Sequence, residues 1–122
     1  MELMKVGVVE LVNEHSLGNH AVAQLQEMGF NVEREEVEQL IDLPGKAQRI
    51  SEECDGLLVL ADVTNKEFVD ETVEALLRVE LDTGKPVHKV IEEKGYQDRH
   101  HFQEDITETA RQRAEEIAEE IR

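Results

Sequence analysis

Hydrophobic positions along the chain alternate between two patterns, one typical of strands and one typical of helices. Four short apolar runs rich in Val, Leu and Ile predict strands at residues 5–12, 30–37, 55–61 and 85–91. The run 55–61 is the most apolar of the four, which predicts a central strand. Alternating charges interrupt 30–37, which favours a place nearer an edge of the sheet.

Helical spacing of apolar residues follows each of these strands. It predicts helices between Ser16 and Gly29, over 42–53, between Thr64 and Gly84, and over 105–122, with a polar loop at 92–103. Thr64 and Glu67 have the spacing of a capping box, so the third helix is predicted to begin there. The predicted buried stripe of that helix consists of Phe68, Val69, Val73, Leu76 and Leu77.

The resulting order, β-α-β-α-β-α-β-α, indicates one α/β domain spanning residues 1–122. Strands that alternate with helices form parallel sheets through right-handed crossovers. The prediction is therefore a flavodoxin-like, three-layer αβα sandwich around a four-stranded parallel sheet.

Composition narrows the classes of partner. The chain has 13 Lys and Arg against 29 Asp and Glu, a net charge of −16, which argues against nucleic acid and anionic membrane surfaces. Cys54 is the single cysteine, so no internal disulfide can form, and we expect it to be a small buried group. The sequence shows no signal peptide and no apolar run long enough to span a membrane, which predicts a cytoplasmic protein.

In parallel sheets of this kind, ligands bind beyond the carboxyl ends of the strands. No glycine-rich phosphate loop follows any predicted strand, which disfavours a dinucleotide site. Asp62 and Thr64 follow the central strand and could bind a ligand, but a strand-end carboxylate and a helix cap are the favoured interpretation. The five histidines lack the spacing of a metal site, so no metal centre is predicted.

Three stretches resemble the lumazine synthases and the related archaeal riboflavin synthases. "VEQLIDLPGKAQRISEECDGLLVLAD" (37–62) resembles the family's second crossover, with Val37, Asp42, Leu43 and Pro44 at matching positions. "EALLRVELDTGKPVHKV" (74–90) resembles its next helix and strand, and "KVGVVELVN" (5–13) resembles its first strand. The tail "ARQRAEEIAEEI" (110–121) is closer to the archaeal riboflavin synthases.

The chain also departs from this family. The Pro-Gly pair of the family's turn is Glu38 and Gln39 here, and its Leu-Gly after the central strand is Ala61 and Asp62. The following loop is too short for the family's phosphate-binding residues and catalytic His. Archaeal riboflavin synthases act on an uncharged ribityl-lumazine, so the resemblance implies that activity rather than lumazine synthesis.

The resemblance thus implies a transferase that moves a four-carbon unit between two molecules of 6,7-dimethyl-8-ribityllumazine, in a site shared between subunits of a homopentamer. Its substrate-binding residues would be Val12, Asn13, Leu40, Ile41, Asp42, Asp62 and Thr64. Ile41 would pack on the ring system, whereas the carboxylates and Asn13 would hold ribityl hydroxyls. The catalytic residues stay unassigned, no cofactor is assigned, and Mg²⁺ is left open.

Two other functions fit the same residues. The chain could be a non-catalytic paralogue that assembles and binds a flavin or a lumazine, because the family's motifs are lost together. A nucleoside deoxyribosyltransferase is the second alternative, since "CDGLLVLAD" and "GKPV" resemble that family's strands. Leu76 occupies the register of that family's nucleophilic Glu, with Glu74 and Glu80 off it.

Overall fold

The computed structural model describes residues 4–11, 17–63, 67–93 and 99–121. Strands and helices alternate along the chain as predicted, and no strand boundary differs from its prediction by more than two residues. The elements are β1 (Lys5–Leu11), α1 (Leu17–Glu27), β2 (Asn31–Val37), the 3-10 turn η1 (Leu40–Asp42), α2 (Leu43–Ser51), β3 (Gly56–Val63), α3 (Val69–Thr83), β4 (Val87–Glu93) and α4 (Arg99–Ile121).

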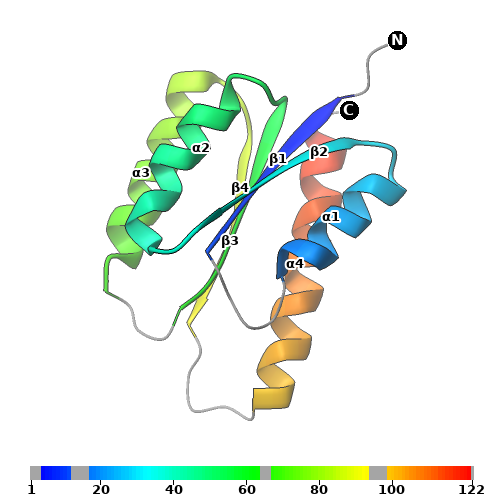
Figure 1. The fold of residues 1–122 in the computed structure, drawn as a ribbon, viewed down its shortest axis with the longest axis vertical. Coiled ribbons are helices and arrows are strands. Elements are labelled where there is room, and N and C mark those ends of the chain that lie inside the picture. Colours follow the sequence, from blue (N-terminus) through cyan, green and yellow to red (C-terminus); the bar gives the residue numbers. More distant parts are fainter. Residues whose placement is uncertain (1–3, 12–16, 64–66, 94–98, 122) are drawn as a thin grey trace.

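The four strands form one parallel sheet with the order β2-β1-β3-β4. Helices α1 and α4 cover one face of the sheet, whereas α2 and α3 cover the other (Figure 1). This is the predicted three-layer αβα sandwich with flavodoxin-like topology, in which the first half of the chain winds outward to β2 and the second half to β4. The carboxyl ends of β1 and β2 therefore lie side by side, because the two strands are parallel neighbours.

Each face of the sheet has its own hydrophobic core. Val6 and Val8 of β1 point toward α1 and α4, while Val9 points toward α2 and α3. This alternation is the ordinary consequence of strand geometry, in which successive side chains point to opposite faces. The inner strands are apolar on both sides because helices cover both faces.

The edge strand β2 has a different composition. Four of its seven residues, Glu33 to Glu36, are charged. One side of β2 pairs with β1, and the described part of the chain places no strand on the other side. Charged side chains on such an edge discourage pairing with another chain.

Two glycines end helices as the sequence predicts. Gly29 has φ +93° and Gly84 has φ +70°, the left-handed conformation that glycine adopts without strain. The chain reverses direction at each of these glycines and returns to the sheet as the next strand.

The predicted start of the third helix is wrong. Helix α3 begins at Val69, after a turn at Glu67 and Phe68, and its N-cap Phe68 makes no side-chain capping bond. Thr64 lies outside the described residues. The buried residues of α3 are Thr72, Leu76 and Val79, so Leu76 is buried as predicted. Val69 and Val73 are half-buried, and Phe68 and Leu77 are about half exposed, contrary to the prediction.

The last helix is longer than predicted. It begins at Arg99, inside the stretch 92–103 that was predicted to be a loop, and β4 extends to Glu93. Arg and Gln in this stretch are good helix formers, so its polarity did not exclude a helix. No helix in the described part of the chain has both the length and the apolar character needed to cross a membrane.

Candidate functional site

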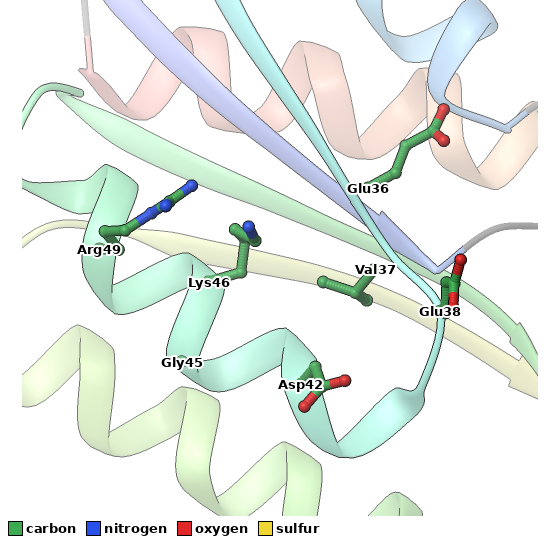
Figure 2. A pocket seen from close by; sticks show the side chains of 7 residues that line it. All are labelled: Glu36, Val37, Glu38, Asp42, Gly45, Lys46 and Arg49. Carbon is green, nitrogen blue, oxygen red and sulfur yellow. The ribbon is translucent and has the colours of Figure 1, made fainter.

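A groove of about 510 Å³ lies between the outer edge of β2 and helix α2 (Figure 2). Its lining residues are Glu36, Val37, Glu38, Asp42, Gly45, Lys46 and Arg49. The groove opens at the carboxyl end of β2, the edge where ligands bind in parallel sheets. Its volume falls in the range of small-molecule pockets.

Positive and negative side chains lie at opposite ends of the groove. Lys46 and Arg49 extend from α2 toward the strand, and Glu36 points to the other face of the sheet (Figure 2). Both cations lie near one carboxylate, Glu35, with Arg49 Nη2 at 3.3 Å and Lys46 Nζ at 4.0 Å. Glu38 and Asp42 line the opposite end and are exposed. The groove thus offers carboxylate acceptors for hydroxyl groups at one end and guanidinium and ammonium donors at the other.

The carboxyl end of the neighbouring strand β1 is built differently. Glu10, the next-to-last residue of β1, lies on the face covered by α1 and α4 and is only 2% exposed. Its Oε2 accepts a hydrogen bond of 2.8 Å from the backbone N–H of Gly18, in the first turn of α1. Its Oε1 accepts one of 2.6 Å from Arg34 Nε, and Arg34 Nη2 also contacts Oε1. The carboxylate is therefore paired in charge and bonded on both oxygens.

Two residues support this pair. Arg34 Nη1 donates to Asn19 Oδ1 at 2.6 Å, which fixes the guanidinium against α1. A Cβ atom at Gly18 would lie 2.5 Å from Cδ and Oε2 of Glu10, so only glycine allows the carboxylate to approach the helix this closely.

The structure places three of the predicted site residues in one turn, η1. Asp42 lines the groove, whereas Leu40 is half-buried and packs on the core beneath α2 and α3. Ile41 is 60% exposed and does not line the groove.

Asp62 does not join this turn. It lies in β3 rather than after it, and β1 separates β3 from β2. Leu58 and Leu60 belong to the core under α1 and α4, so by strand alternation Asp62 faces that side, opposite the groove. The sheet therefore does not bring Asp42 and Asp62 together within one protomer. The other predicted residues, Val12, Asn13 and Thr64, lie outside the described residues.

Cys54 is a buried thiol, as predicted. It is 3% exposed, and its Sγ lies 3.9 Å from Glu33 Oε2. Burial, followed by the charge of Glu33, raises the pKa of Cys54 to about 11. A thiol held protonated in this way is a poor nucleophile at neutral pH.

Metal chemistry finds no support among the described side chains. None of the groups of His, Cys, Asp and Glu in this part of the chain has the arrangement of a metal site.

The nucleoside deoxyribosyltransferase alternative requires a carboxylate in the register of Leu76. Leu76 is fully buried in the core between α3 and the sheet. The described residues supply no nucleophile at that place.

Sequence reasoning missed Glu10, Arg34, Lys46 and Arg49. A signal for the first two exists: Val6, Val8 and Glu10 share one strand face, so a carboxylate continues a buried apolar stripe. Such a carboxylate needs a cation on a neighbouring element, and Arg34 is the only cation in β2. Lys46 and Arg49 carried no comparable signal, because exposed cations on a helix are common.

Comparisons with known proteins give the fold and no family. No protein-family model matches the chain, and no curated protein matches it. A de novo designed Rossmann-fold protein is similar over 92% of this chain and 99% of its own, with a TM-score of 0.57 and 13% identity. An oxidoreductase from Corynebacterium diphtheriae covers 98% of this chain and 99% of its own, with a TM-score of 0.49 and 11% identity. At 13% identity, the likeness to the designed protein concerns the fold alone.

Proposed function

We propose that the groove between β2 and α2 binds a neutral, hydroxyl-rich heterocycle, and that the chain is a riboflavin synthase of the archaeal type. The groove carries this proposal, because it lies at the carboxyl end of β2 and includes Asp42 of the turn that resembles that family. Carboxylates at Glu38 and Asp42 can accept hydrogen bonds from a ribityl chain, and they repel anionic ligands.

The proposed reaction uses two molecules of 6,7-dimethyl-8-ribityllumazine. One donates a four-carbon unit to the other, and the products are riboflavin and a ribitylamino-pyrimidine. Neither substrate carries a phosphate, which agrees with the acidic end of the groove and with a net charge of −16. The groove is open along the free edge of β2, so a neighbouring protomer of a homopentamer would complete it.

The test is riboflavin formation from purified protein and 6,7-dimethyl-8-ribityllumazine, followed by chromatography and fluorescence. We expect turnover in the wild type and a loss of at least about tenfold in kcat/KM for Asp42→Asn and for Glu38→Gln, one hydrogen-bonded charge each. Glu119→Gln is the matched control, since it removes one exposed charge from α4 on the far face of the sheet. Equal losses in all three variants would assign the effect to net charge and not to the groove.

A second candidate is a binding protein that lacks turnover. It is favoured by one observation: the groove contains no His, Ser, Thr, Cys or Tyr among its lining residues. Isothermal titration with ribityl-lumazine and riboflavin separates the two candidates, because a binder gives heat and no riboflavin. The absence of both heat and product would exclude both, and light scattering would test the pentamer directly.

The cellular location proposed for this function is the cytoplasm. The buried thiol of Cys54 fits a reducing compartment, where free cysteines persist.

A further inference from the structure

The N-terminus of α1 already holds an anion, and the chain itself supplies it. Helix N-termini that follow a strand of this fold are the usual binding place of phosphate groups, because their backbone N–H groups point outward. Here the Gly18 N–H points at Glu10 Oε2, 2.8 Å away. We propose that Glu10 permanently occupies this anion site. It thereby excludes phosphorylated ligands from the β1–α1 corner, the place where Glu10 at the end of β1 meets Gly18 in the first turn of α1.

The corner has the components that a phosphate site requires. A guanidinium, that of Arg34, lies against the carboxylate, with Nε 2.6 Å from Oε1. Asn19 Oδ1 accepts from Arg34 Nη1 at 2.6 Å and so orients that guanidinium toward α1. Gly18 has no Cβ, which lets an acceptor reach its backbone N–H. A helix amide, a fixed guanidinium and a glycine are the groups that bind phosphate oxygens elsewhere.

Burial explains why an external anion cannot compete. Glu10 is 2% exposed, and its carboxylate fills the space that a Cβ on Gly18 would need. The carboxylate is also tethered to β1, so its effective concentration at the helix is higher than that of a free ligand. A phosphate would have to displace it and leave a buried carboxylate without its partners, which is costly.

This inference deepens the proposed function, because it states that the ligand is unphosphorylated. That one statement rests on the proposed function. The anion site itself is independent of riboflavin synthesis, and Glu10 acts as a specificity-determining residue rather than as a reacting group.

The decisive experiment removes the internal anion. In Glu10→Ala, the space beside Gly18 and Arg34 becomes available to inorganic phosphate. Thermal unfolding in phosphate and in chloride at matched ionic strength, together with ³¹P line broadening, measures binding. We expect a saturable rise in the unfolding temperature of Glu10→Ala with phosphate, with an affinity at least about tenfold above that of the wild type.

Glu35→Ala is the matched control, because it removes a carboxylate from β2, the strand beside β1, and this carboxylate also pairs with an arginine. Arg49 then lacks its partner, but it is 63% exposed and no helix N-terminus adjoins Glu35 in the described contacts. We expect no saturable effect of phosphate there. An equal response in both variants would mean that any freed arginine binds phosphate, and the inference would be wrong.

The phosphate test remains decisive even if Glu10→Ala fails to fold in chloride. If the variant is unfolded in chloride, refolding in phosphate reports the same binding, and failure to refold in phosphate contradicts the inference. Glu10→Gln keeps the size of the side chain but replaces one acceptor by a donor, so it should be less stable than the wild type, still fill the space, and show no phosphate effect. A folded Glu10→Ala that binds phosphate no better than the wild type also contradicts the inference.

A second arm uses a matched pair of ligands, riboflavin and its 5′-phosphate, which differ only by the phosphate. The wild type should prefer riboflavin by at least about tenfold, and Glu10→Ala should narrow that ratio. Equal affinity of the wild type for both would overturn the exclusion. If neither flavin binds, the proposed function fails, whereas the phosphate titration still decides whether Glu10 occupies an anion site.

Discussion

Two neighbouring corners of the sheet, β1–α1 and β2–α2, have the same topology and opposite character. In the first, Glu10 is buried and bonds to the amide of Gly18. In the second, Asp42 occupies the N-cap of α2 with helical backbone angles and makes no side-chain capping bond, and a groove remains open beside it. Glu10 thus reaches from its strand to the amide of the next helix, whereas Asp42 lies in the turn and lines an open groove.

The same contrast exists between the two faces of β2. Arg34 faces α1 and meets a carboxylate that is almost completely buried, whereas Glu35 faces α2 and meets two cations at the surface. Pairs of charges in water contribute little to stability, while a buried charge that loses its partner is costly. The corner and the groove should therefore respond differently to equivalent substitutions.

The largest expected effect is that of Arg34→Met. It leaves the Glu10 carboxylate buried with one hydrogen bond from Gly18, and we expect a loss of about 2–3 kcal/mol in the free energy of unfolding. Arg49→Met removes an arginine of α2 that pairs with Glu35 on the other face of the same strand, and it should cost at most about 0.5 kcal/mol. Urea denaturation of both variants gives the comparison, and similar losses would show that the two faces are equivalent.

A smaller loss is expected from Gly18→Ala, although alanine is the better helix former. The new Cβ would displace the Glu10 carboxylate from its bonds, at a cost of about 1–2 kcal/mol. Gly45→Ala in α2 has the opposite expected sign, because a Cβ there meets nothing within 4 Å and the helix gains up to about 1 kcal/mol. Stabilisation by both substitutions would mean that the carboxylate moves freely.

Cys54 offers a pH-dependent measurement on the α2 side of the sheet. The pKa of its thiol is raised from 9.0 to about 11, first by burial and then by Glu33. Between these two values the unfolded chain has lost the proton that the folded chain keeps, so stability falls as the pH rises from about 9 to about 11. Unfolding midpoints over this range should fall more steeply in the wild type than in Cys54→Ala, and parallel curves would assign the decline to other groups.

The smallest effect on stability is expected for Ile41→Ser. Ile41 is 60% exposed, so its replacement should change the free energy of unfolding by less than about 0.5 kcal/mol. If Ile41 packs on the ring of the proposed ligand, the same variant should still weaken the binding of riboflavin in isothermal titration. Unchanged affinity would remove Ile41 from the site and leave Glu38 and Asp42 as its determinants.

The sequence by itself determined the order of strands and helices, the edge position of β2, the helix ends at Gly29 and Gly84, and the burial of Cys54. These features depend on local periodicity, on charge within one segment, or on the backbone freedom of one residue, all of which can be read along the chain. The start of α3 could not be read in this way, because the capping-box spacing of Thr64 and Glu67 indicates a nearby helix without fixing its first residue.

Only the tertiary structure decided the two corners. Glu10 and Arg34 are 24 residues apart, and they meet because the parallel register of β1 and β2 places Val8 beside Arg34 and Glu10 beside Glu36 on one face. The groove likewise combines a strand edge with a helix that follows it by a turn. A side chain's partners depend on strand register and on which face it occupies, and these are set by the packing of the whole sheet rather than by any single segment.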